Sequence, residues 1–266
     1  MDFKVMEQDS SNSRLLIILS IPRSLSTIFS RILMNIPNSE VIFSQFVNFH
    51  WDKVDKNINV TEHINEFIIK IEKTLQEGKF VVLKEPGFLF VEEFKEAFAK
   101  IVEKFNPKLL YLIRHPKACY ASYCKLLESE RKNNEIVSDR VNHLLRERFE
   151  DTWTLYQKYK GLVVITEDLQ REPIKTFTQV FNYVGLIFEE SYLKFEPLKN
   201  IGVPKTLSAF PPWYEDCLNS TEFKPRVTNI ENIVIEDAEI SERIEFSTIF
   251  YKKFVLESEQ YKKSSD

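Results

Sequence analysis

Residues 22–27, with the sequence Pro-Arg-Ser-Leu-Ser-Thr, are rich in groups that bind anions. The donors are the guanidinium of Arg23 and the hydroxyls of Ser24, Ser26 and Thr27. A guanidinium presents its N–H groups in a planar fork that matches two oxygens of a phosphate or sulfate group. Hydroxyls add donors that can turn toward the remaining oxygens. These six residues therefore predict a phosphate or sulfate site.

The segments on either side of this turn predict a strand and a helix. Residues 15–19 form a continuous apolar run, which is typical of a parallel strand buried on both faces. Residues 27–33 carry apolar side chains at helical spacing. A turn between a strand and a helix offers backbone N–H groups and the positive end of the helix dipole to a bound phosphate. The alternative is a strand followed by a Ser/Thr-capped helix that binds no ligand.

Three more polar clusters follow apolar runs that predict strands. They are Lys84-Glu85 after residues 80–83, Arg114-His-Pro after residues 108–113, and Glu167-Asp168 after residues 162–165. Ligands bind at the carboxyl ends of parallel strands, so we expect all four clusters at one edge of a sheet. An alternative explanation of Arg114 is an ion pair with a carboxylate such as Asp168. An alternative explanation of Lys84 is a lysine at a strand end whose ammonium reaches solvent. Glu167 and Asp168 are expected to hold the basic segments in place.

Strands and helices alternate along the chain. A further strand is expected at 41–43, and the strand that begins at residue 162 is expected to end in residues 166–169. Helices are expected at 61–76, 91–105, 117–129, 139–159, 173–184 and 240–261. The alternation predicts an α/β fold, a three-layer sandwich with a central, mostly parallel sheet. Residues 200–226 contain four prolines and predict a long ordered loop or lid before the last helix. We expect one domain over 1–266, with 1–13 flexible and 200–266 forming the lid and C-terminal helix.

The composition is that of an ordinary globular protein, with 43% hydrophobic and 29% charged residues among 266. A net charge of −4 gives no general attraction to nucleic acid or to an anionic membrane. Three cysteines suit free thiols in a reducing compartment, and the scattered histidines predict no metal site. The polar N-terminal residues lack a signal-peptide core, so a cytoplasmic location is expected by default.

Three segments resemble sulfotransferases that use 3′-phosphoadenosine-5′-phosphosulfate (PAPS). The segments are residues 21–31, residues 112–122, and residues 164–169 together with Pro173 and residues 181–186. The first resembles the 5′-phosphosulfate loop, of the arginine-containing type found in tyrosylprotein and bacterial sulfotransferases. The second is similar to the 3′-phosphate motif, an Arg after a strand and a Ser eight residues on. The third resembles a Tyr-Glu-Asp-Leu strand end with its following helix and turn. The resemblance implies a P-loop nucleotide-binding-like fold with a C-terminal loop-and-helix extension.

The resemblance implies two anion sites, because PAPS carries charge on its 5′-phosphosulfate and on its 3′-phosphate. The implied contacts to the 5′ end are Arg23, Ser24, Leu25, Ser26 and Thr27, and those to the 3′-phosphate are Arg114 and Ser122. Arg23 is expected to neutralise charge on the leaving oxygen during in-line sulfuryl transfer. Lys84 is expected to contact the sulfuryl group or its bridging oxygen. PAPS is the implied donor, and no metal is required.

Departures from the family pattern leave the general base open. Pro86 stands where a His usually follows the Lys, and Gln45 stands where a Glu is usual. A glutamine side chain cannot take up the proton. The remaining candidates are Glu85, His50 and Asp52, with Glu85 and His50 ranked equally.

Two more departures concern the backbone and the nucleotide. Leu25 replaces the usual Gly of the loop, which predicts a turn without a positive φ at that position. The Arg-Lys-Gly motif expected near the C-terminus is not recognisable, and Lys224 and Arg226 are its nearest substitute.

The leading expectation is a sulfotransferase that acts on a hydroxyl or amine of a small molecule with an apolar or aromatic part. The aromatic residues that would line its pocket, each also explained as core, are Phe43, Phe46, Phe49, Trp51, Phe88, Phe90 and Trp213. One alternative is a degenerate sulfotransferase-like protein that binds the nucleotide without transfer. Another is an ATP-using phosphoryl transferase, although the Gly-Lys-Ser/Thr signature is absent. The sequence does not decide the oligomeric state and leaves a homodimer open.

Overall fold

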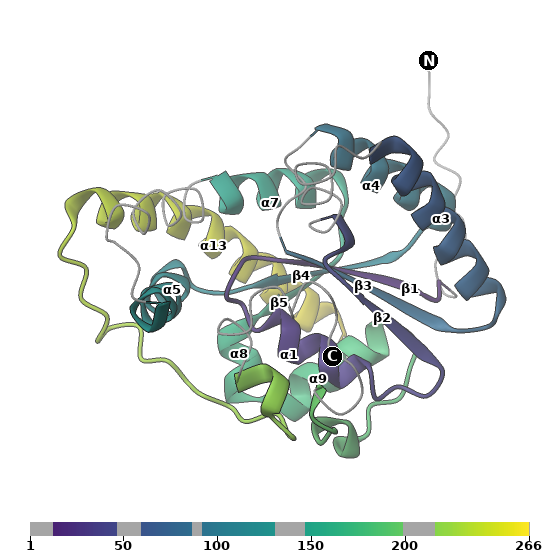
Figure 1. The fold of residues 1–266 in the computed structure, drawn as a ribbon. Helices are drawn as coiled ribbons and strands as arrows, with labels where there is room; N and C mark the ends of the chain where they lie inside the picture. The colour runs from purple at the N-terminus through teal and green to yellow at the C-terminus, as the bar shows by residue number, and fades with distance from the viewer. Residues whose placement is uncertain (1–12, 47–59, 87–91, 131–146, 199–215, 266) are drawn as a thin grey trace.

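The computed structural model describes residues 13–46, 60–86, 92–130, 147–198 and 216–265. Within these ranges a five-stranded sheet has the order β2-β3-β1-β4-β5, and every neighbouring pair is parallel. The strands are β1 (Leu15–Ser20), β2 (Ser39–Phe43), β3 (Phe80–Pro86), β4 (Lys108–Ile113) and β5 (Leu162–Ile165). The predicted α/β class with a parallel central sheet is confirmed (Figure 1).

Helices cover both faces of the sheet (Figure 1). They are α1 (Ser26–Leu33), α3 (Val60–Gln76), α4 (Glu92–Phe105), α5 (Pro116–Glu130), α7 (Glu147–Lys158), α8 (Thr166–Arg171), α9 (Pro173–Tyr183) and α13 (Ala238–Ser265), with a 3₁₀ turn η2 (Glu190–Leu193). Helices α3, α4 and α7 lie over one face, and α1 and α9 lie over the other.

The apolar runs of the strands form two separate cores, because successive side chains of a strand point to opposite faces. In β1, Leu15, Ile17 and Leu19 join the core under α3 and α4, whereas Leu16 and Ile18 join the core under α1 and α9. All five of these side chains are at most 2% exposed. Burial on both faces explains why the strands read as continuous apolar runs and not as alternating ones.

The long C-terminal helix α13 lies along the β5 edge and contacts both cores. Its Phe254 is buried with the first core, and Tyr261 packs against the second. The carboxylate of Asp237 accepts hydrogen bonds from the backbone N–H groups of Glu239 and Ile240, at 2.9 and 3.1 Å, and so caps the start of the helix. The helix continues to Ser265, past the predicted end at residue 261.

Most predicted elements are found within one or two residues of their expected bounds, and two differ in a way that affects the site. Strand β3 continues to Pro86 and includes Lys84 and Glu85, which we had expected to follow it. Residues 166–169 are not a strand end but the start of α8, where acidic residues in the first turn favour a helix. Of the predicted helix 139–159, residues 147–158 are helical as α7, and residues 139–146 lie outside the described part.

Part of the predicted loop or lid 200–226 also lies outside the described residues. Residues 216–219 form a short helical turn, and Glu222 makes an antiparallel bridge to Lys194. All three cysteines carry free thiols, as predicted. In the described ranges no group of three or more His, Cys, Asp or Glu side chains is arranged to hold a metal ion. None of the helices described there is long and apolar enough to cross a membrane.

Candidate functional site

The turn between β1 and α1 is built from two residues with positive φ. Arg23 has φ 68° and Leu25 has φ 66°, so the prediction that Leu25 needs no positive φ is wrong. The left-handed conformation of Leu25 lets α1 begin at once, at Ser26, after a tight reversal of the chain. Leu25 is the N-cap residue, and no side chain makes a capping hydrogen bond there. The first-turn amides of α1 therefore lack the side-chain cap that usually satisfies one of them.

Buried hydroxyls without partners lie in and just before this turn. Ser20 Oγ and Ser24 Oγ have no hydrogen-bond partner, and the two residues are 1% and 0% exposed. An unpaired buried hydroxyl costs free energy, and a ligand oxygen placed beside it would remove that cost. The backbone here is held by Thr166, whose Oγ1 donates to the carbonyl of Ser24 at 3.1 Å. The residues present therefore fit a ligand rich in acceptor oxygens.

The second predicted site lies directly beside the first, because β1 and β4 are neighbouring parallel strands. Arg114 Nη1 donates to the carbonyl of Arg23 at 2.7 Å, and Arg23 Nε donates to Ser122 Oγ at 3.1 Å. Arg114 Nη2 donates to Thr228 Oγ1 at 3.2 Å. Arg114 is 7% exposed. The two segments predicted to bind the two ends of one nucleotide thus meet through direct hydrogen bonds.

Glu167 holds the Arg114 segment in place, as the sequence predicts. Its Oε1 accepts from the backbone N–H of His115 at 3.0 Å, and its Oε2 accepts from Tyr251 Oη at 3.3 Å. Burial raises the pKa of Glu167, and the hydrogen bond from His115 opposes that rise. Burial also lowers the pKa of His115 to about 4, helped by the charges of two lysines, so this imidazole is neutral at physiological pH.

Asp168 does not pair with Arg114, which had been the alternative explanation for that arginine. Its carboxylate accepts from Arg171 Nη1 at 3.2 Å and from Lys262 Nζ at 2.8 Å. Lys262 belongs to α13, so Asp168 fastens the C-terminal helix to α8. The guanidinium of Arg114 donates hydrogen bonds to the carbonyl of Arg23 and to Thr228 Oγ1 instead.

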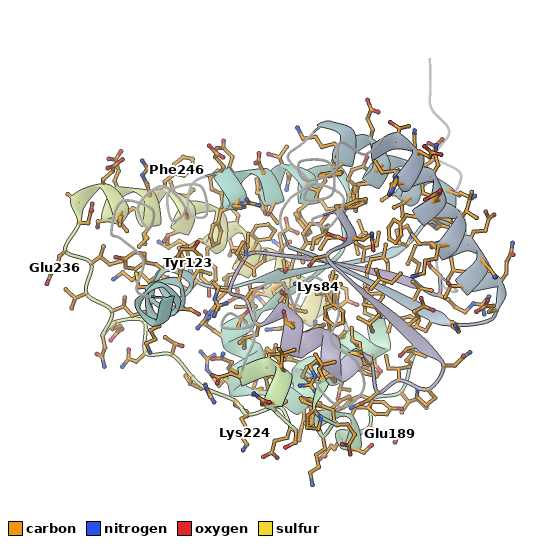
Figure 2. The ribbon with its side chains drawn as sticks, in the orientation of Figure 1. Lys84, Tyr123, Glu189, Lys224, Glu236 and Phe246 are labelled. Atoms are coloured by element: carbon orange, nitrogen blue, oxygen red, sulfur yellow. The ribbon has the colours of Figure 1, made fainter. Side chains whose placement is uncertain are left out.

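Lys84 lies inside the fold, on the face of the sheet that α1 covers (Figure 2). It is 2% exposed, and its Nζ donates to Ser44 Oγ at 3.3 Å. Burial lowers the pKa of Lys84 to about 8, against the raising effect of the Glu85 carboxylate. A snorkelling lysine would reach solvent, and this one does not. At neutral pH its ammonium is a buried cation on the side of the sheet that α1 covers.

Glu85 points to the opposite face, because it is the next residue of the same strand. Its Oε1 accepts from the backbone N–H groups of Gln45 and Phe46 at 2.7 and 3.3 Å, and its Oε2 is buried without a partner. Burial raises the pKa of Glu85 to about 8, and the two amide hydrogen bonds oppose this. Glu85 thus fixes the chain after β2.

The other candidate bases, His50 and Asp52, lie outside the described residues, as do five of the seven aromatic residues predicted to line an acceptor pocket. Phe43 and Phe46 are described, and both are core residues, 4% and 1% exposed. Phe46 stacks on Phe94 with ring centroids 5.5 Å apart. Phe43 and Phe46 therefore agree with the alternative explanation, that they are core residues.

The roles of two residues in this region were not predicted from the sequence. Thr228 contacts Arg114 from a segment without any recognisable motif. Arg31, on α1, is 2% exposed, and its guanidinium donates to the carbonyls of Glu196, Cys217 and Ser220. It also lies over the ring of Phe195, 4.1 Å from the centroid. Arg31 holds these distant segments against α1, and its place as the one charged residue of this short helix was the signal of that role.

No protein-family model and no curated protein matches this sequence. Among solved structures, the sulfotransferase domain of the Synechococcus PCC 7002 olefin synthase superposes with a TM-score of 0.61 at 18% identity, over 92% of this chain and 97% of that domain. The sulfotransferase domain from the curacin biosynthetic pathway gives 0.51 at 15% identity, over 86% of this chain and 95% of that domain. The chain therefore has the sulfotransferase fold.

Proposed function

We propose that this protein is a sulfotransferase that moves a sulfuryl group from PAPS to a hydroxyl or amine of a small molecule. The observation that carries the proposal is the junction of the two anion-binding segments. Arg114 Nη1 lies 2.7 Å from the carbonyl of Arg23, and Arg23 Nε lies 3.1 Å from Ser122 Oγ. A nucleotide with phosphate groups on both its 3′ and 5′ positions needs two such sites side by side.

The 5′-phosphosulfate would bind at the start of α1. Ser24, Ser26 and Thr27 would donate to its oxygens, and the unpartnered Ser24 Oγ supports this assignment. The backbone N–H groups of the first turn and the helix dipole favour an anion here. Lys84 would place its charge near the oxygen that joins the sulfuryl group to the phosphate. It is charged at neutral pH, because its pKa lies near 8.

In the proposed transfer, the bond between sulfur and the 5′-phosphate oxygen breaks as sulfur bonds to the acceptor. The products are the sulfated acceptor and 3′-phosphoadenosine-5′-phosphate (PAP), and the acceptor loses a proton. We propose Glu85 and His50 as the candidates that take this proton. With its pKa raised to about 8 by burial, Glu85 is mostly protonated at neutral pH and would take up this proton only above about pH 8. The hydrogen bonds that Glu85 Oε1 accepts from the backbone N–H groups of Gln45 and Phe46 favour instead a structural role, in which Glu85 holds the chain after β2 in place.

The test of the donor is a comparison of nucleotides by thermal shift and calorimetry. We expect PAP to bind more tightly than ATP, ADP or AMP, because the 3′-phosphate would contact Arg114 and Ser122. Equal or better binding of ATP, with dependence on magnesium, would instead indicate a phosphoryl transferase. Replacement of Arg114 by Ala is expected to weaken PAP binding while leaving the protein folded.

The test of transfer is movement of radiolabelled sulfate from PAPS to a panel of phenols and amines, using the wild type and the Glu85→Gln and His50→Ala variants. Loss of turnover with unchanged PAP affinity in one variant would identify the base. PAP binding without transfer to any acceptor would favour a nucleotide-binding protein that has lost catalysis. Gln45 and Pro86, which stand where the family has a Glu and a His, are the observation that keeps this second function open.

A further inference from the structure

Arg31 fastens a segment from late in the chain, residues 216–220, to α1. Its Nη1 donates to the carbonyl of Cys217 and, at 3.0 Å, to that of Ser220, and its Nη2 donates to the carbonyl of Glu196. Ser220 Oγ also accepts from Nη1, at 3.2 Å. Figure 1 shows this segment, called here the docked segment, beside α1. One buried guanidinium fork therefore sets the position of the docked segment.

The docked segment also lies against the carboxyl end of β2. Its Leu218 packs against a small buried cluster formed by Phe43 and Leu198. Phe43 is the last residue of β2, and its register partner on β3 is Lys84. The residue after Phe43 is Ser44, whose Oγ accepts from Lys84 Nζ at 3.3 Å. The docked segment is thus held at the place where β2 and β3 present the lysine.

The electrostatics of Cys217 show that the docked segment reaches Lys84 itself. Burial is the main cause that lowers the pKa of Lys84 to about 8, and Glu85 and Cys217 oppose it. Burial likewise raises the pKa of Cys217, whereas Arg31 and Lys84 lower it and Asp216 raises it further. Cys217 and Lys84 therefore each act on the ionisation of the other. One thiol of the docked segment is within reach of both cations.

We infer that Arg31 is a positioning residue, which fastens the docked segment over Lys84 and keeps water away from the lysine ammonium. The inference rests on the proposed function in one respect, the use of Lys84 to attract the anionic donor. A charge that is held away from bulk water acts more strongly on a nearby anion. The docked segment would therefore strengthen donor binding through the water that it excludes, with Arg31 acting from the far side of the segment.

The experiment follows the ionisation of Lys84 by NMR of protein labelled with carbon-13 at lysine Cε. The Lys84 signal is identified by its absence from Lys84→Met. Arg31→Lys keeps the positive charge and loses the planar fork, so the docked segment should loosen and admit water. We expect the titration midpoint of Lys84 to move from about 8 in wild type to about 9 or above in this variant. The double variant Arg31→Lys/Lys84→Met identifies the signal of the added lysine.

A second variant and a matched control separate this effect from a general loosening of the fold. Leu218→Ala weakens the contact of the docked segment without changing a charge, so the midpoint of Lys84 should rise in the same direction. Asn35, just after α1, fastens a different segment, because its Nδ2 donates to the carbonyls of Tyr192 and Lys194 at 2.8 Å each. Asn35→Ala should lower the melting temperature and leave the midpoint of Lys84 unchanged.

PAP binding provides a second measurement, which also depends on the proposed function. By calorimetry at neutral pH, we expect Arg31→Lys to bind PAP about three- to tenfold more weakly than wild type. A more hydrated Lys84 keeps its proton to higher pH. Between about pH 7 and 9.5 the dissociation constant should therefore rise less than about fourfold in the variant, against about tenfold in wild type.

The outcomes separate the inference from the function on which it rests. A Lys84 midpoint that stays at the wild-type value in Arg31→Lys and in Leu218→Ala would overturn the inference, whether or not PAP binds. A rise of the same size in Asn35→Ala would also overturn it. If Arg31→Lys does not fold, Leu218→Ala alone decides. Failure of the wild type to bind PAP would overturn the proposed function, while the midpoints would still test the covering of Lys84. A rise confined to Arg31→Lys and Leu218→Ala would support the inference.

Discussion

At the scale of single residues, Lys84 and Glu85 show how one strand places two ionisable groups in different environments. Both are 2% exposed, and burial moves the pKa of each toward about 8, down for the lysine and up for the glutamate. Lys84 lies on the face of the sheet that α1 covers, and Glu85 lies on the face of the other core. Their adjacency in sequence had suggested a shared site, and the alternation of a strand separates them.

We predict that PAP affinity falls as pH rises through about 8. A bound anion favours the protonated form of Lys84, and burial has lowered the pKa of that ammonium to about 8. The favourable interaction is therefore present below this pH and is lost above it. Between pH 7 and 9.5 the dissociation constant should rise on the order of tenfold, corresponding to about 1.4 kcal/mol. Calorimetry at several pH values measures it.

Two variants distinguish Lys84 from other groups that titrate in the same range. Lys84→Met should bind PAP weakly and without this pH dependence. Glu85→Gln should keep the fall, although the pKa of Glu85 is also near 8. Lys79→Met, at a lysine that pairs with Glu40 and Glu77 away from the turn, should behave as wild type. A pH-independent affinity in the wild type would contradict the role of Lys84.

At the scale of elements, the start of α1 depends on a residue in an unfavourable conformation. Leu25 has φ 66°, in the left-handed region, which costs a residue with a Cβ about 1–2 kcal/mol. The sequence did not predict this, because Leu gives no signal of a positive φ where Gly would have given one. Tight closure of the turn over Ser24, which is fully buried, imposes the conformation on whichever residue stands there.

We predict that Leu25→Gly and Leu25→Val differ in stability. Gly relieves the strain and increases the freedom of the unfolded chain, so the free energy of unfolding should change by less than about 1 kcal/mol. Val is β-branched, and we expect it to lower that free energy by about 1–3 kcal/mol. Urea denaturation measures both. Ile28→Val, on the same helix without a positive φ, serves as the control for a lost methyl group. A Leu25→Val variant as stable as wild type would show that the turn adapts.

At the scale of the whole molecule, the pattern of burial made the sheet predictable, and long-range contacts made parts of the site unpredictable. Strands buried on both faces give apolar runs that mark β1, β3, β4 and β5 in the sequence. The meeting of Arg23 with Arg114 follows once β1 and β4 are neighbours. Thr228 is 114 residues from Arg114 along the chain, and no local pattern announces it. Its position depends on how the C-terminal segment packs over the finished sheet.

The helix α13 connects this late part of the chain to the site. Tyr251 on α13 donates from Oη to Glu167 Oε2 at 3.3 Å, and its ring lies edge-on to that of His115, 4.9 Å between centroids. Glu167 in turn accepts from the backbone N–H of His115, the residue after Arg114. A second tyrosine binds the same helix elsewhere, with Tyr156 Oη donating to Glu257 Oε2 at 2.6 Å. The two hydroxyls tie α13 to different parts of the molecule.

Because the two tyrosines contact different parts of the molecule, their variants separate an effect on the position of Arg114 from an effect on the stability of the fold. Tyr251→Phe removes a donor from Glu167 and loosens the segment that carries Arg114, so PAP affinity should fall about three- to tenfold, as expected for one hydrogen bond. Tyr156→Phe removes a hydrogen bond between α7 and α13, so it should lower the melting temperature without moving PAP affinity by more than about twofold. Calorimetry and thermal denaturation of both variants measure the two effects. If both variants lost affinity in proportion to stability, α13 would act only as a part of the scaffold. Selective loss in Tyr251→Phe would instead mean that the C-terminal helix sets the position of Arg114 through Glu167 and His115.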